Sequence, residues 1–146
     1  MPKPLAAEEV VRVVYAAFNS ADSAKISAMA QDYFADEVIV REAESLPWGG
    51  VYEGLDTVAA MTAGIASAES PIDAARLQIE QLIAGRPDPS GTTQVVAVVS
   101  FPWRGPRTTI PMRALEWFTV RSGKVVEIQV FLWDTAAANA VLGEDG

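Results

Sequence analysis

The stretch Trp117-Phe-Thr-Val-Arg-Ser-Gly-Lys-Val-Val-Glu127 decides the fold, because it joins two strands through a tight turn. β-Branched and aromatic residues lie on both sides of Arg121-Ser-Gly123, a composition typical of a hairpin. Working outward, the same reasoning predicts strands over Arg76–Ala84, Thr93–Trp103, Thr108–Val120 and Lys124–Trp133. The connectors are short and rich in Gly or Pro, which indicates that neighbouring strands pair antiparallel.

The first half of the chain is mainly helical. Apolar residues between Pro4 and Phe18 recur at the spacing of one helical face. Asp22 can cap a second helix, and a third starts at Asp56 or Thr57. The remaining predicted elements are a strand over 38–42, a short strand over 51–52 and a last helix over 136–142.

Helices followed by a run of strands indicate an α+β fold. A chain of 146 residues has room for one domain. We take this domain as residues 1–146, with a core over about residues 5–142. We expect a curved antiparallel sheet wrapped around the N-terminal helices, which would form a cone with an interior pocket.

The composition narrows the chemistry. There are 11 basic and 19 acidic residues, a net charge of −8, which argues against nucleic-acid and anionic-membrane partners because both need a basic surface. The chain has no Cys and no His, so proton transfer is left to carboxylates, Tyr, Lys or Arg. It has no metal-ligand spacing and no Gly-rich phosphate loop, so we expect neither a metal nor an organic cofactor. It also lacks an apolar run of about 18 residues and turns acidic at Glu8-Glu9, which predicts a soluble, cytoplasmic protein.

Five short strings spread over nearly the whole chain form a family pattern. They are Val14-Tyr-Ala-Ala-Phe-Asn-Ser-Ala-Asp22, Tyr33-Phe-Ala-Asp-Glu-Val38, Leu46-Pro-Trp-Gly-Gly-Val-Tyr-Glu-Gly54, Trp117-Phe-Thr-Val-Arg-Ser-Gly-Lys-Val-Val-Glu127 and Phe131-Leu-Trp-Asp-Thr-Ala-Ala137. In this order they resemble the nuclear-transport-factor-like superfamily, in particular its SnoaL-like and ketosteroid-isomerase-like branch. The resemblance implies a cystatin-like cone. This fold hosts isomerases, cyclases, dehydratases, epoxide hydrolases and non-catalytic binders.

The resemblance also places the functional groups of ketosteroid isomerases on this chain. Their general base falls on Glu42 and their second acid on Glu116. Their oxyanion-hole tyrosine falls on Val14, and Tyr15 follows one residue later, about 100° around the helix. The catalytic set of limonene epoxide hydrolases would fall on Val95-Val96-Ala97 and near Val130, and that of SnoaL cyclases on Ile128-Gln129-Val130, so neither set is present.

The sequence around both glutamates favours inward carboxyls. Glu42 follows Val38 and Val40 on one strand face, and Glu116 lies between Ala114 and Phe118. A buried, unpaired carboxyl has a raised pKa, which suits proton transfer near neutral pH. The alternatives are a solvent-facing strand end for Glu42, or structural ion pairs of these glutamates with Arg41 or Arg113.

A second group of residues is predicted to bind substrate. It comprises Tyr15, Tyr52, Trp48, Arg113, Phe118, Phe131 and Asp134. The tyrosines could donate to a ligand oxygen or lie at the edge of the core, and Asp134 could instead cap the last helix. Aromatic residues that could line an apolar cavity or fill the core are Trp48, Trp103, Trp117, Trp133, Phe18, Phe34, Phe118 and Phe131.

Two functions of different kinds follow. The first is a cofactor-independent acid–base enzyme for a small hydrophobic molecule, carbonyl-bearing or polycyclic, in which Glu42 moves a proton and Glu116 polarises an oxygen. Isomerisation, cyclisation and dehydration share this proton abstraction, and epoxide opening would need a different acid set. The second is a non-catalytic binding or accessory protein of the same fold.

The last strand predicts a homodimer. It is apolar on both faces, with Val126, Ile128, Val130 and Leu132 on one face and Phe131 and Trp133 on the other. One face can cover the helices, which leaves the other in need of a partner. Related folds pair in this way, so the resemblance points to the same assembly.

Overall fold

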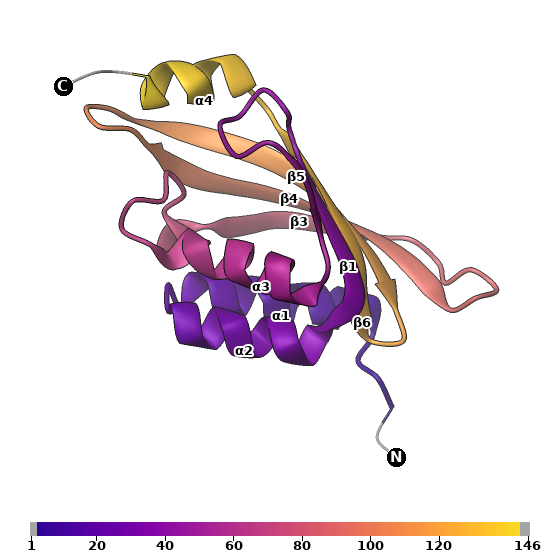
Figure 1. Cartoon of the computed structure of the whole chain (residues 1–146). Coiled ribbons are helices and arrows are strands. Elements are labelled where there is room, and N and C mark those ends of the chain that lie inside the picture. Colours follow the sequence, from indigo (N-terminus) through magenta and orange to yellow (C-terminus); the bar gives the residue numbers. More distant parts are fainter. Residues whose placement is uncertain (1–2, 144–146) are drawn as a thin grey trace.

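The computed structural model describes residues 3–143. Its helices and strands are α1 (Ala7–Asn19), α2 (Ser23–Tyr33), β1 (Phe34–Glu42), β2 (Gly50–Glu53), α3 (Leu55–Ala63), β3 (Gln78–Ala84), β4 (Thr92–Arg104), β5 (Thr109–Arg121), β6 (Lys124–Leu132) and α4 (Thr135–Leu142), with 3₁₀ turns at Gly64–Ala66 and Ala74–Arg76. Six strands form one curved sheet, and α1, α2 and α3 cover one of its faces (Figure 1). α4 lies at the far end of the long strands. The α+β layers predicted from the sequence are confirmed.

The strand order is β2-β1-β6-β5-β4-β3. The predicted hairpins β3–β4, β4–β5 and β5–β6 are confirmed as antiparallel pairs. Among the described strands, one pair departs from the expected antiparallel sheet, because β1 and β6 run parallel with Val40 opposite Ile128. A parallel pair needs a long crossover instead of a hairpin. All the elements from β2 to β5 lie between these two strands in the chain.

Two helices begin at aspartates, as predicted. The Asp22 carboxylate accepts hydrogen bonds from the backbone N–H groups of Ala24 at 2.9 Å and Lys25 at 3.2 Å, at the start of α2. Asp134 accepts one from the N–H of Ala137 at 2.9 Å, at the start of α4. Each carboxylate satisfies N–H groups that have no partner within the helix, which is worth about 1 kcal/mol.

A bulge changes which residues of β6 face the helices. Val120 pairs with Val125, but the preceding Thr119 pairs with Glu127, so Val126 is left without an opposite residue. Val125 is fully buried, whereas Val126 is only half-buried. The regular alternation predicted for this strand is therefore interrupted at Val126, because the bulge adds one residue to β6.

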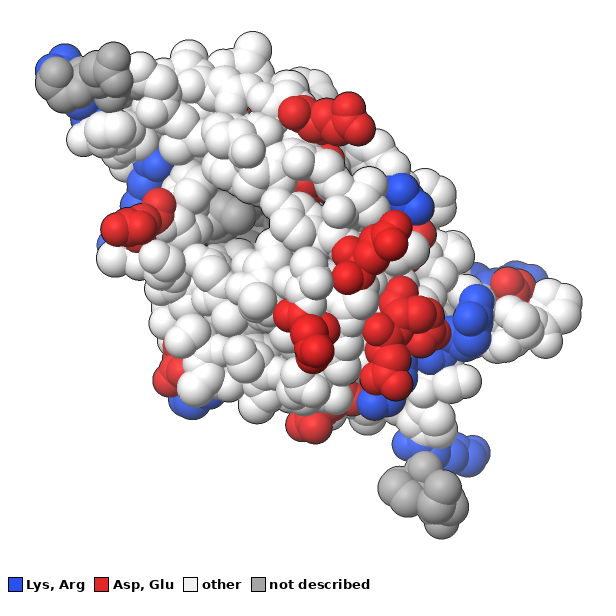
Figure 2. All heavy atoms as spheres, in the orientation of Figure 1, with Lys and Arg blue, Asp and Glu red and all other residues white. Residues whose placement is uncertain are grey.

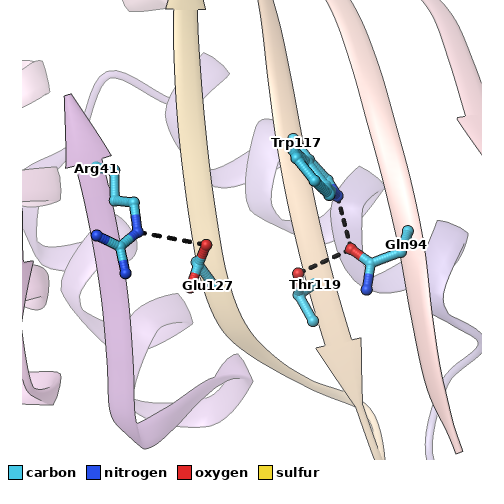
Figure 3. Close-up of polar contacts among 5 residues, drawn as sticks. All are labelled: Arg41, Gln94, Trp117, Thr119 and Glu127. Atoms are coloured by element: carbon cyan, nitrogen blue, oxygen red, sulfur yellow. Dashed lines mark hydrogen bonds and ion pairs between the residues drawn. The ribbon is translucent and has the colours of Figure 1, made fainter. Parts of the chain in front are cut away.

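The face of the sheet that the helices leave uncovered is partly apolar. Leu115, Trp117 and Phe131 are exposed there to 46%, 41% and 48%. Polar contacts hold the neighbouring side chains, as Figure 3 shows: Trp117 Nε1 and Thr119 Oγ1 both donate to Gln94 Oε1, at 2.6 and 2.9 Å. We call this surface the outer face.

None of the helices within residues 3–143 is long and apolar enough to cross a membrane.

Candidate functional site

Glu42 and Glu116 line one chamber of about 60 Å³ inside the fold. Glu116 of β5 pairs with Val130 of β6. Arg41 pairs with Gln129, so Glu42 falls beside Val130 from the other side. The two glutamates are therefore at the same level of the sheet, two strand spacings or roughly 10 Å apart at their Cα atoms. Both side chains point to the face that the helices cover.

The remaining walls of the chamber are apolar. They are formed by Phe18, Leu46, Trp48, Ile65, Ile72, Leu77, Phe101, Trp103, Ala114, Val130 and Leu132. No Lys or Arg of the described chain lines it. The two carboxyls therefore share a low-dielectric space without a countercharge, where a lone negative charge is costly.

An outer pocket of about 250 Å³ continues the chamber. Glu42, Trp48, Ile65 and Ile72 line both spaces, so they form the throat between them. The outer pocket is completed by the end of α3 and the segment after it. Figure 2 shows a hollow beside this segment, with a rim built mostly from residues that are neither acidic nor basic.

A larger open groove of about 940 Å³ lies on the other side of Leu77 and Phe101. Neither Glu42 nor Glu116 lines it. We therefore place the candidate site in the smaller chamber, where the titratable groups meet an enclosed apolar space.

Tyr15 reaches Glu116 from α1. Its hydroxyl donates a hydrogen bond to Glu116 Oε1. The ring of Tyr15 is buried and packs edge-on against Phe18 and Phe118, each with ring centroids 5.8 Å apart. The buried stripe of α1 is wide enough to include both Val14 and Tyr15, so an offset of one residue from the family's tyrosine position still leaves the hydroxyl facing the sheet.

Burial perturbs the acidity of all three groups. Burial, together with the charge of Glu116, raises the pKa of Glu42 to about 8. Burial also raises the pKa of Glu116, and the hydrogen bond from Tyr15 opposes that rise. The pKa of Tyr15 is raised well above its usual value by burial and by the neighbouring Glu116. At neutral pH Glu42 therefore carries a proton.

The arginines that could have paired with these glutamates pair elsewhere. Arg41 contacts Glu127 at 3.5 Å on the outer face (Figure 3), and Arg113 contacts Glu80 at 2.9 Å. Both arginines sit one residue out of phase with the inward side chains of their strands, so the pleat turns them away from the chamber. The interpretation of Glu42 and Glu116 as partners of Arg41 or Arg113 is wrong.

The predicted substrate-binding residues divide into those near the chamber and those away from it. Trp48 lines the throat. The Tyr52 hydroxyl donates a hydrogen bond to the backbone carbonyl of Trp48, so this hydroxyl is engaged within the protein. Phe118 is buried behind Tyr15 and does not line the chamber.

Three others face away from the chamber, contrary to expectation. Phe131 points outward because it alternates with the inward Val130 and Leu132. Arg113 lines the open groove. Asp134 caps α4, the alternative already raised for it.

The chamber residues differ in how clearly the sequence marks them. Phe101 and Trp103 follow the regular alternation of buried residues along β4, and Trp103 is already a candidate lining residue, whereas Phe101 could have been placed inward from the same pattern. Ile65, Ile72 and Leu77 lie in the irregular segment between α3 and β3. The sequence there has no helical or strand periodicity that would predict which side chains point inward.

The described residues 3–143 contain no group of three or more acidic side chains placed to hold a metal ion.

Comparison with solved structures identifies the fold. The chain resembles a protein of unknown function with a cystatin-like fold from Xanthomonas campestris, with a TM-score of 0.70 and 16% identity, over 96% of this chain and 100% of that one. It also resembles a putative SnoaL-like polyketide cyclase from Jannaschia, with a TM-score of 0.61 and 15% identity over 94% and 92% of the two chains. A hypothetical protein with a ketosteroid isomerase-like fold from Catenulispora acidiphila, in complex with trimethylamine, gives a TM-score of 0.65 and 15% identity over 94% of each chain.

No family model matches the sequence, and the search of curated proteins gives no match. At these identities the structural likeness establishes the nuclear-transport-factor-like fold. Proteins of one fold can differ in function, so the function has to be argued from the site.

Proposed function

We propose, from the nuclear-transport-factor-like fold and from its paired carboxyls, that this chain is a cofactor-independent acid–base enzyme acting on a small hydrophobic carbonyl compound. The observation that carries the proposal is that Glu42 and Glu116 share one apolar chamber without a countercharge. A carboxyl with a pKa of about 8 is suited to hold or transfer a proton at neutral pH. Perturbed pairs of this kind gather at functional sites.

The shared proton supports a balanced reaction step. The ionised carboxyl takes a proton from the carbon next to the carbonyl, and the electron pair of the broken C–H bond passes into an enolate. The protonated carboxyl donates a hydrogen bond to the enolate oxygen, so the total charge of the site does not change. Returning the proton to another carbon of a conjugated enolate gives isomerisation. Attack of the enolate carbon on a second carbonyl forms a C–C bond and an alkoxide, which takes the proton back from the carboxyl and so gives cyclisation.

The two connected spaces favour a substrate of a particular shape. The chamber of about 60 Å³ holds a small reacting group next to the carboxyls. The outer pocket of about 250 Å³ holds a larger apolar body. We therefore expect the carbonyl at one end of the substrate and its ring system at the other.

Hydrogen–deuterium exchange tests the step without knowledge of the final product. The protein is incubated in D₂O with ketones that range from cyclohexanone to a tricyclic ketone, and NMR follows deuterium at the α-carbon. We expect exchange well above the buffer rate, and a loss of roughly 10²- to 10⁴-fold in the double variant Glu42→Gln/Glu116→Gln, which leaves neither carboxyl to accept the proton. Glu80→Gln is the matched control, because Glu80 pairs with Arg113 outside the chamber. Exchange at the buffer rate for every ketone would contradict the proposal.

A non-catalytic binding protein is the second candidate. One observation favours it: the Tyr15 hydroxyl is engaged by Glu116 and does not line the chamber. The likeness to a protein in complex with trimethylamine also points to small-molecule binding. A ketone that raises the melting temperature without α-exchange would support this candidate.

A further inference from the structure

Glu42 and Glu116 differ in their hydrogen bonding. Glu116 accepts the hydroxyl of Tyr15, whereas Glu42 accepts no hydrogen bond from any residue between 3 and 143. A hydrogen bond from a neutral donor stabilises the charged form of a carboxyl. Glu42 and Glu116 therefore share one chamber, but only Glu116 has a hydrogen bond that stabilises its ionised form.

We propose that Tyr15 is a positioning residue that assigns the single proton of the pair, because it keeps Glu116 ionised and leaves the proton on Glu42. The location of the proton can be measured in the resting protein. Its consequence for catalysis rests on the proposed function.

The packing of Tyr15 holds the donor in place. Phe18, one turn further along α1, and Phe118, on the same strand as Glu116, contact the ring edge-on. The ring is fully buried, so water does not compete for its hydroxyl. A fixed donor in a low-dielectric interior stabilises charge more strongly than a donor in water.

Among the described residues, no further titratable group lines the chamber to offset the difference in hydrogen bonding between Glu42 and Glu116. Tyr15, Glu42 and Glu116 are the titratable groups that meet there from α1, β1 and β5. The segment after α3 contributes Ile65 and Ile72 to the chamber wall, and the β6 residues that line it are also apolar. Once Glu116 is ionised, its negative charge disfavours ionisation of Glu42.

This assignment reverses the roles suggested by the family resemblance. The resemblance makes Glu42 the base and Glu116 the protonated donor. With Tyr15 bound to Glu116, the base is Glu116 and the hydrogen-bond donor to the substrate oxygen is Glu42. Tyr15 itself touches neither carbon nor oxygen of the substrate and acts through Glu116.

Carboxyl-resolved NMR tests the assignment without any substrate. The protein is labelled with ¹³C at the side-chain carboxyl of Glu, the two signals are assigned from Glu42→Gln and Glu116→Gln, and both are followed from pH 4 to 10. We expect Glu116 to lose its proton first and Glu42 last, near pH 8. If Glu116 loses its proton after Glu42 in the unmodified protein, the proposal is overturned.

Tyr15→Phe supplies the second measurement. Removing the hydroxyl should move the titration of Glu116 upward by about one pH unit or more, and Glu42 should titrate at a lower pH because its neighbour is now neutral. Tyr33→Phe is the control, since Tyr33 makes no hydrogen bond to either carboxyl. Unchanged titrations in a folded Tyr15→Phe would also overturn the proposal. If this variant does not fold, the order of titration in the unmodified protein decides.

The two proposals fail separately. Absence of α-exchange together with the expected titrations would remove the enzymatic function and keep the role of Tyr15. Rapid exchange with the reverse order of titration would remove the role of Tyr15 and keep the enzyme.

Discussion

Glu42 and Glu116 approach one chamber from opposite sides of Val130. This arrangement puts two acids in an apolar space that tolerates one negative charge better than two. The site therefore stores a proton that the unfolded chain would release at neutral pH. Such storage links the chemistry of the site to the stability of the fold.

Stability should fall as pH rises from about 4.5 to about 8. The pKa of Glu42 is about 4.5, its ordinary value, when the chain is unfolded and about 8 when it is folded, so the folded protein binds more protons in this window. A raised carboxyl pKa stabilises the folded state below the window, and the effect is lost as pH increases, by up to about 1.4 kcal/mol per pH unit.

Glu42→Gln should remove this dependence, because an amide stays neutral. At pH 5 the variant and the unmodified protein should have similar melting temperatures, and at pH 9 the variant should be the more stable. Glu44→Gln is the matched control, since Glu44 is exposed two residues away. Parallel melting curves at both pH values for Glu42→Gln and the unmodified protein would contradict the buried acid.

Trp48 should limit the size of the ligand that reaches the carboxyls. It lines both spaces at the throat, and its ring packs against Trp103 with centroids 5.5 Å apart. Trp48→Ala should merge the chamber and the outer pocket and raise the α-exchange of a tricyclic ketone relative to cyclohexanone. Trp133→Ala, which removes an indole that is 82% exposed, should leave that ratio unchanged. An equal ratio in both variants would argue against a size limit at Trp48.

Gly49 should be required for the loop that presents Trp48. A Cβ at Gly49 would lie 2.2 Å from the carbonyl oxygen of Ala43 and 2.6 Å from Glu44 Cα, both backbone atoms that cannot rotate away. We expect Gly49→Ala to lower the free energy of unfolding by roughly 1–3 kcal/mol.

Gly64→Ala is the opposite case and a matched control for Gly49→Ala. A Cβ at Gly64 meets nothing within 4 Å, and φ there is −63°. Since Ala restricts the unfolded chain, this variant should be more stable by about 0.4–1 kcal/mol. Chemical denaturation measures whether Gly49→Ala lowers the free energy of unfolding and Gly64→Ala raises it. A Gly49→Ala protein as stable as Gly64→Ala would contradict the close approach of Gly49 to the backbone of Ala43 and Glu44.

The sequence predicts the parts of this molecule that depend on local patterns. Alternation along β5 places Glu116 inward, and cap chemistry places Asp22 and Asp134 at helix starts. Features that depend on contacts distant in sequence are missed. The parallel pairing of β1 with β6 has no local pattern, and the bond from Tyr15 to Glu116 joins residues 101 positions apart. The chamber itself depends on Ile65 and Ile72, and no helical or strand periodicity in the sequence predicts that their side chains point inward.

The outer face should bind a second copy of the chain. Val98, Leu115 and Phe131 are opposite one another on three adjacent strands, and Trp117 lies in the next row. Their apolar surface is uncovered in the single chain, and burying it in a symmetric pair is favourable by about 25 cal/mol per Å² before the costs of association.

The homodimer is tested by sedimentation at micromolar concentration. The unmodified protein should sediment as a dimer, and Phe131→Glu should sediment as a monomer, because burying its charge opposite Leu115 would be costly. Ala60→Glu is the control and should remain dimeric, since Ala60 is exposed on α3, on the helical side of the sheet.

Phe131 lies next to Val130 in the chamber wall, so the titration of Glu42 measured in Phe131→Glu shows whether the chamber needs the partner. We expect it unchanged, because both carboxyls and Tyr15 come from one chain. A monomeric unmodified protein at micromolar concentration would rule out the dimer.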